Sequence, residues 1–292
     1  MGEGVEYMLQ IQHLTKRYGD LVAVDDLTMT IEDGDIFGFI GLNGAGKTTT
    51  IKAVVGIHTF DAGEVLINGT SIKTNPVACK KQLAYIPDNP DLYTFMSGIK
   101  YLNFVADIFD VPQATRRERI DQYATGLELA DDLASPISSY SHGMKQKLAL
   151  ISALIHAPRL LVLDEPFVGL DPKAAYWIKE YFKEMTAGGA SIFFSTHGLE
   201  VAQNLCNKIA IIQKGVLLEA GPTEEIAGKE SLETVFLDLL NESTDGPPRA
   251  GQKGRFFLSG TRGAGQKEPS PLSGEPPAGG SATMGTPGTA RR

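Results

Sequence analysis

The segment Gly41–Thr48 has the residue types and spacing of a loop that binds phosphate groups. It reads GLNGAGKT, which matches the pattern G-x-x-x-x-G-K-[ST], and it follows the apolar run 36–40. Glycines let backbone N–H groups curve around a polyphosphate, and the start of a following helix adds partial positive charge. We therefore expect Lys47 to reach the β- and γ-phosphates of a nucleotide and Thr48 to ligate Mg²⁺. The candidate nucleotide-binding residues of this loop are Gly41, Asn43, Gly44, Ala45, Gly46, Lys47, Thr48 and Thr49.

Two acidic residues follow a second apolar run. Residues 160–163 read LLVL and are followed by Asp164 and Glu165. The carboxyl ends of parallel strands meet at the edge of a sheet where ligands bind. Asp164 is therefore a candidate for holding Mg²⁺, directly or through water, and Glu165 is a candidate general base that polarises the attacking water. A strand end with two solvated carboxylates is the alternative, which the phosphate loop disfavours.

A histidine and a capped helix are two further candidates. His197 follows the apolar run 191–195, where converging strand ends would place it near the γ-phosphate; a structural histidine is the alternative. The segment 140–146, YSHGMKQ, opens a helical pattern in which Ser141 can act as N-cap. A capped helix start beside Gly143 is a second candidate anion site in the same chain, and an ordinary cap is the alternative.

Apolar β-like stretches and helical patterns alternate along the first 241 residues. Such alternation predicts an α/β core with a largely parallel sheet. Residues 97–157 differ, because three successive helical patterns predict a helical lobe that interrupts the core. The expected strands are 8–11, 27–31, 35–40, 64–67, 83–86, 160–163, 191–195 and 208–212. The expected helices are 47–55, 98–109, 115–128, 142–156, 173–185 and 198–206.

Composition and charge limit the possible functions. The 292 residues are 42% hydrophobic and 21% charged, and the net charge of −8 argues against non-specific binding of nucleic acid or anionic membranes. No apolar stretch is long enough to span a bilayer, and residues 1–10 lack the apolar block of a signal peptide. Cys79 and Cys206 stand far apart with no CxxC or histidine partner, so we expect a reducing cytoplasm rather than a disulfide framework or zinc ribbon.

The last 51 residues have a different composition. Residues 242–292 contain 11 Gly and 7 Pro and show no apolar periodicity. Such a segment cannot bury enough surface to offset its ordering entropy. We therefore expect a folded domain over 1–241 and a disordered tail over 242–292, which is either a weak docking arm for an anionic partner or a dispensable extension.

In this order, the motifs resemble the ATP-binding-cassette (ABC) ATPase subunit of transporters over roughly residues 8–240. The phosphate loop, the segment 140–146, the strand ending in Asp164 and Glu165, the residues 169–171 and then His197 form a five-part signature. The segment YSHGMKQK at 140–147 and the segment YIPD at 85–88 are most similar to bacterial ABC-2-type and Ecs-type exporter ATPases. The resemblance implies a P-loop NTPase core with an inserted helical lobe and an antiparallel β portion near the N-terminus.

The resemblance also implies roles that spacing alone does not supply. In this family two nucleotide domains close head to tail over two ATP molecules, so Ser141 and Gly143 would face the ATP held by the partner's phosphate loop. Tyr18 matches the aromatic residue that stacks on adenine, with an ordinary strand-end tyrosine as the alternative. Asp171 matches the loop that crosses the dimer.

Four positions depart from the family's pattern. His142 replaces the first glycine of the signature pair, Met144 replaces its glutamine, and Val168 replaces a common serine. Asp88 stands where most members carry a glutamine that senses Mg²⁺, water and the membrane partner, so we expect it to contribute to the metal site as a shorter, negatively charged oxygen ligand. These departures concern coupling rather than nucleotide binding.

By resemblance, the chain is an ATP-hydrolysing subunit with ATP and Mg²⁺ that drives transport, with export favoured, through a separately encoded membrane permease. Its expected partners are a second nucleotide-binding subunit, identical or different, and that permease, with no nucleic acid, at the cytoplasmic face of the membrane. Residues 89–98 border the groove that receives the permease, although their apolar side chains would equally suit the core of the lobe. The alternatives are a soluble ABC ATPase outside transport and a low-turnover regulatory half.

Overall fold

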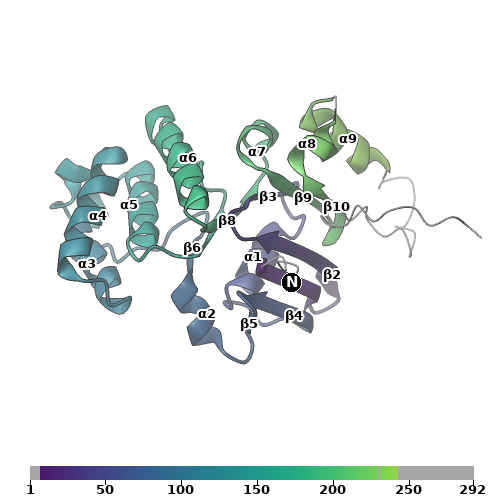
Figure 1. Ribbon diagram of the computed structural model, residues 1–292, viewed down its shortest axis with the longest axis horizontal. Helices are drawn as coiled ribbons and strands as arrows, with labels where there is room; N and C mark the ends of the chain where they lie inside the picture. Colours follow the sequence, from purple (N-terminus) through teal and green to yellow (C-terminus); the bar gives the residue numbers. More distant parts are fainter. Residues whose placement is uncertain (1–6, 229, 243–292) are drawn as a thin grey trace, which may run out of the picture. The chain divides into compact units, whose positions relative to one another are not determined.

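Near the N-terminus, apolar residues alternate with polar ones over two long segments, which pair as the first two strands of an antiparallel sheet. The computed structural model describes residues 7–228 and 230–242 (Figure 1). Leu9, Ile11 and Leu14 of the first strand are fully buried, while Gln12 and His13 between them are exposed. The sheet has the order β2-β1-β4-β5, with β1 (Tyr7–Tyr18), β2 (Leu21–Glu32), β4 (Ala62–Ile67) and β5 (Thr70–Ser71).

A second sheet is built from strands that are apolar throughout. Every residue of β3, β7 and β8 is buried, as expected for parallel strands covered on both faces. All neighbouring strands of this sheet run parallel except β9 and β10. Its order is β10-β9-β3-β8-β7-β6, with β10 (Val216–Pro222), β9 (Lys208–Gln213), β3 (Ile36–Ile40), β8 (Ser191–Thr196), β7 (Leu160–Asp164) and β6 (Leu83–Ile86).

The helices form two sets. α3 (Gly98–Ile108), α4 (Gln113–Gly126) and α5 (His142–Leu154) pack on one another and lie apart from β2, β4 and β5 in Figure 1. Short 3₁₀ turns at Ala130–Asp132 and Ile137–Ser139 join α4 to α5. The remaining helices are α1 (Lys47–Val54), α2 (Pro76–Gln82), α6 (Pro172–Ala187), α7 (Leu199–Leu205), α8 (Thr223–Ala227) and α9 (Leu232–Glu242).

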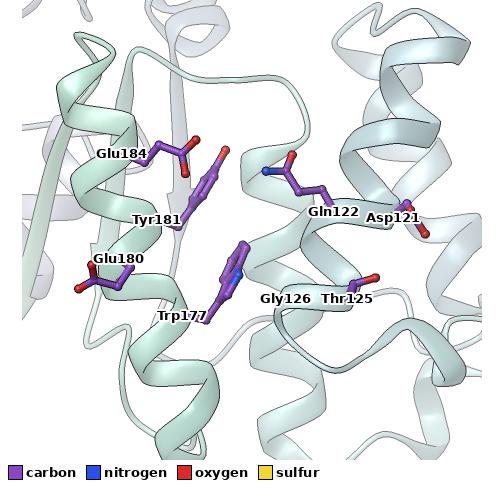
Figure 2. Close-up of a pocket in the computed structure, with 8 residues that line it drawn as sticks. All are labelled: Asp121, Gln122, Thr125, Gly126, Trp177, Glu180, Tyr181 and Glu184. Carbon is purple, nitrogen blue, oxygen red and sulfur yellow. The ribbon is translucent and has the colours of Figure 1, made fainter.

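Aromatic side chains join α6 to the helical lobe. The rings of Trp177 and Tyr181 stack with their centroids 5.2 Å apart, and the Tyr181 hydroxyl lies 2.8 Å from that of Tyr123 on α4. Burial and the bond to Tyr123 raise the pKa of Tyr181. Figure 2 shows the rings of Trp177 and Tyr181 between α6 and α4, where Asp121 and Glu184 line the same pocket. The pocket contains none of the residues of the phosphate loop.

The predicted α/β fold with an antiparallel portion near the N-terminus is confirmed, and every expected strand and helix is present. The bounds differ most in β1 and β2, which extend to 12 residues each because register shifts carry them past polar positions. β5, β10, α2 and α8 were not predicted, since each has seven residues or fewer. α9 was not predicted either, although its apolar residues recur at helical spacing. The predicted tail at 242–292 lies outside the described residues except for Glu242, with which α9 ends. In the described part of the chain, no helix is long and apolar enough to cross a membrane.

Replacing Phe193 by Ala should destabilise the fold. Phe193 on β8 is fully buried against Phe37 and Phe39, and truncating such a side chain costs about 3–5 kcal/mol. Denaturant unfolding monitored by circular dichroism measures the change. Phe95→Ala is the matched control, because Phe95 is 84% exposed; equal losses in the two variants would contradict the assigned core.

Candidate functional site

The phosphate loop joins the end of β3 to the start of α1. Gly46 occupies the N-cap position of α1 with φ of 108°, so no side chain caps the helix and the N–H groups of its first turn stay available to a ligand. A Cβ atom on Gly46 would lie 2.6 Å from the carbonyl oxygen of Ala23, which shows how closely the loop packs on β2. The loop is therefore held in shape by glycine and by the neighbouring sheet.

Lys47 begins α1 and points back into this loop. Its Nζ donates a hydrogen bond to the carbonyl oxygen of Gly41 at 2.7 Å and lies 3.7 Å from Oε1 of Glu165. The side chain is buried, so these partners offset the cost of removing its charge from water. A polyphosphate entering the loop offers the ammonium group stronger negative partners at the same place.

Asp164 ends β7 with its carboxylate held by two hydroxyl groups. Oδ2 accepts a hydrogen bond from Oγ1 of Thr48 at 2.7 Å, and Oδ1 accepts one from Oγ of Ser195 at 2.5 Å. Asp164 and Ser195 are side by side in the register of β7 and β8. The sequence placed Asp164 and Thr48 in one site, and the structure brings them into direct contact.

Glu165 and His197 also meet, as an ion pair. Nδ1 of His197 lies 2.9 Å from Oε1 of Glu165, whose side chain is mostly buried. Glu165 has φ of 51°, a conformation that costs a non-glycine residue on the order of 1–3 kcal/mol and that clusters at functional sites. The strained backbone directs the Glu165 carboxylate toward Lys47 and His197. Both Lys47 and His197 therefore lie within ion-pair distance of this carboxylate.

A single cavity of about 610 Å³ brings most of the predicted nucleotide-binding residues together. Tyr18 lines it and is 45% exposed, with its hydroxyl 2.7 Å from Nδ1 of His58. Leu21 and Lys214 line it as well, although nothing in their sequence surroundings marked them. The predicted residues in the lining are Tyr18, Asn43, Gly44, Ala45, Gly46, Lys47, Thr48, Thr49, Asp88, Asp164 and Glu165.

Ser141, Gly143 and Asp171 do not line this cavity and form a second group. The hydroxyl of Ser141 caps α5 by accepting from the N–H of Met144 at 3.2 Å. Asp171 caps α6 in the same way and pairs with Nζ of Lys147 on α5 at 2.6 Å. The hydrogen bond from Lys147 holds the pKa of Asp171 below its ordinary value.

His142, which replaces a glycine of the signature pattern, lies against the loop before α6. A Cβ atom on Gly169 would be 2.7 Å from Cδ2 of His142, so the imidazole rests directly on the backbone there. The space that the histidine needs is thus provided by Gly169. This contact explains how the chain accommodates the departure.

The oxygen groups around Asp164 fit Mg²⁺. This ion is usually held by one or two carboxylates together with substrate phosphates, rather than by a cage of protein ligands. The described residues contain no group of three or more acidic, histidine or cysteine side chains placed for a metal. The hydroxyl of Thr48 and the carboxylate of Asp164 are the two protein ligands that such a phosphate-assisted Mg²⁺ site needs. Asp88 lies in the lining of the same cavity.

Comparison with known proteins agrees with this geometry. The family model described as "ABC transporter" matches residues 24–168. The chain is 38% identical over 213 residues to the uncharacterized ABC transporter ATP-binding protein YhcH of Bacillus subtilis, covering 73% of this chain and 69% of that one. It belongs to the ABC transporter ATP-binding family. The expected family membership and ATPase activity are therefore confirmed.

Two further matches cover nearly all of the related chain. The ABC-type transporter ATP-binding protein EcsA of Bacillus subtilis is 31% identical over 233 residues, which are 80% of this chain and 94% of EcsA. A solved ATP-binding subunit of an ABC transporter superposes with a TM-score of 0.77 at 32% identity, covering 80% of this chain and 99% of that one. These matches confirm the Ecs-type resemblance and the ABC ATPase fold.

Lys47→Ala should abolish the stabilisation by ATP. The variant loses the positive charge directed at the phosphates, so Mg-ATP should no longer raise the melting temperature, whereas the parent protein shifts upward because its folded state binds the ligand. A thermal melt with and without Mg-ATP measures this. Lys52→Ala is the control, since Lys52 lies on the same helix but outside the cavity. An unchanged shift in Lys47→Ala would contradict the assigned role.

Proposed function

We propose that this ATPase drives export through a separately encoded membrane permease, as one half of a dimer that holds two ATP molecules. The observation that carries the proposal is the single cavity lined by the phosphate loop, Asp164 and Glu165. The resemblance of residues 140–147 to exporter ATPases supports the direction of transport. The permease is a separate chain in this proposal, in line with the absence of a membrane-spanning helix from the described residues.

The proposed reaction uses groups that already converge on the cavity. The triphosphate binds the N–H groups of the loop, and Lys47 turns from Gly41 and Glu165 to the β- and γ-phosphates. Thr48 and Asp164 would hold Mg²⁺, which would supply positive charge against the phosphate oxygens. A water oxygen then bonds to the γ-phosphorus while the bond from that phosphorus to the bridging oxygen breaks.

Glu165 accepts a proton from that water, acting as general base. His197 already contacts the Glu165 carboxylate and contacts the γ-phosphate in the bound state. Since Lys47 and His197 both contact the Glu165 carboxylate, binding of the triphosphate by Lys47 would leave this carboxylate free for the role of base.

The second group of residues serves the partner subunit's ATP in this proposal. Ser141 and Gly143 stand at the start of α5, where N–H groups and the helix dipole favour an anion. They lie outside the cavity of their own chain, which agrees with a head-to-tail arrangement. The arrangement serves a homodimer and a heterodimer equally.

The segment 89–98 divides its apolar side chains between two surroundings. Leu92 is buried and Met96 packs on the core of the lobe, whereas Tyr93 and Phe95 are exposed. The rings of Tyr93 and Phe95 stack with centroids 5.8 Å apart, and Phe104 on α3 lies 5.7 Å from Tyr93. The core interpretation therefore holds for Leu92 and Met96, and the exposed aromatic cluster is the contact surface that we propose for the permease.

The test is to look for a hydrophobic protein in the neighbouring reading frames, to express it together with this chain and to purify both from membranes; finding none would speak against the proposal. We expect the two proteins to copurify and the complex to release phosphate from Mg-ATP. A chain that hydrolyses ATP but never associates with the membrane protein would indicate the soluble class. A chain that binds ATP without turnover would indicate the regulatory half.

Glu165→Gln should bind ATP normally but lose turnover. The variant keeps the shape of the side chain and removes the proton acceptor, so hydrolysis should fall by about 100-fold or more. Size-exclusion chromatography with Mg-ATP should then show a trapped dimer, and phosphate release measures the rate. Glu200→Gln is the control, because Glu200 is exposed on α7 and does not line the cavity. Unchanged turnover in Glu165→Gln would refute the general-base role.

Asp88→Gln should narrow the difference in affinity between ATP and Mg-ATP. A carboxylate beside the phosphates repels the metal-free nucleotide, and only the cation neutralises that repulsion. Titrating ATP and Mg-ATP against the parent and against Asp88→Gln measures this difference in affinity for each protein. Asp91→Asn is the control, since this exposed residue follows Asp88 closely but lies outside the cavity lining. If the difference stays the same, Asp88 acts away from the phosphates.

A further inference from the structure

Ser195 is a polar residue in a strand that is closed to water along its whole length. All six residues of β8 are buried, and Ser195 has no exposed surface. It is next to Asp164 in the register with β7 and next to Phe39 in the register with β3. A hydroxyl in such surroundings must find partners inside the protein, because leaving it unpaired is costly.

The partners of Ser195 are the two acidic residues of the site. Its Oγ donates to Oδ1 of Asp164 at 2.5 Å and accepts from the backbone N–H of Glu165 at 3.2 Å. The same N–H also lies 3.2 Å from the carbonyl oxygen of Ser195. One residue thus binds the side chain of the first acid and the backbone of the second.

These two contacts restrain the carboxylate of Asp164 and the backbone of Glu165. Asp164 has two hydroxyl partners, of which Thr48 belongs to the phosphate loop and Ser195 to the sheet. Glu165 has φ of 51°, and its N–H is the backbone donor at the strained position. A strained residue keeps its conformation only when its surroundings hold it. Ser195, which lies in the buried strand β8, provides this restraint through its hydrogen bonds to the Glu165 N–H.

We propose that Ser195 is a positioning residue for ATP hydrolysis, which orients the Asp164 carboxylate and fixes the backbone from which Glu165 reaches the attacking water. The inference rests on the proposed role of Glu165 as general base. Ser195 itself touches neither ATP nor water. Its loss should therefore slow the chemical step while leaving the binding of the triphosphate to the loop intact.

Ser191 provides a matched control on the same strand. It is equally buried, and its Oγ donates to the carbonyl oxygen of Glu32 at 3.0 Å and accepts from the N–H of Gly34 at 3.1 Å. It begins β8, whereas Ser195 lies near the end. Ser191→Ala therefore removes a buried hydroxyl with two partners from the same strand, but away from Asp164 and Glu165.

The experiment compares Ser195→Ala, Ser195→Thr, Ser195→Val and Ser191→Ala with the parent. Threonine and valine have nearly the same shape and differ in the hydroxyl, so this pair separates the hydrogen bonds from packing. The measurements are kcat and KM for Mg-ATP, the affinity of the ATP-bound protein for Mn²⁺ by electron paramagnetic resonance, and the melting temperature. Parent activity is measured first, because an inactive parent refutes the proposed function rather than this inference.

We expect Ser195→Ala and Ser195→Val to lower kcat by about 10- to 100-fold, the size of effect that misplaced reacting groups produce, with KM changed less than about twofold. Ser195→Thr should retain most of kcat, and Mn²⁺ should bind more weakly to the Ala and Val variants than to the Thr variant. Ser191→Ala should keep the kcat of the parent, even if its melting temperature falls. Equal kcat for Ser195→Thr and Ser195→Val would overturn the inference, as would equal loss of kcat in Ser191→Ala and Ser195→Ala. If Ser195→Ala fails to fold, the threonine and valine variants decide.

Discussion

The parallel ladder that joins β3, β8 and β7 determines where the reacting groups lie. Its register sets Ile40 beside Thr196 and Asp164 beside Ser195, so three strands end at the same level. The loop after β3 curves over this edge, and Glu165 and His197 follow the ends of β7 and β8. Because every residue of these strands is buried, the ladder is rigid, and the chemistry is carried by the residues just beyond it.

The partners of the acidic side chains are the second feature of the site. Lys47 and His197 share the carboxylate of Glu165, and the hydroxyls of Thr48 and Ser195 satisfy Asp164. Buried charges need such partners to avoid a large desolvation cost. In the proposed function, the binding of a nucleotide exchanges some of these partners for phosphate oxygens.

Local patterns sufficed for the motifs but not for the contacts that complete the site. The phosphate loop and the acids that follow the apolar run of β7 are short contiguous segments, so their residue types and spacing predict their chemistry. The alternation of strand and helix patterns predicted the fold class. Lys214 escaped prediction because it enters the cavity through the β9–β10 turn, where Gly215 donates to the carbonyl oxygen of Ala45. Ser195 escaped because its importance depends on the register between β7 and β8. Such pairings arise from packing between distant segments, which a single sequence does not display.

The ion pair between Lys147 and Asp171 ties the middle of α5 to the N-cap of α6. Asp171 is also joined to Glu165 by the short loop 165–171, on which His142 rests at Gly169. One ion pair and one short loop therefore connect α5 to the carboxylate in the cavity.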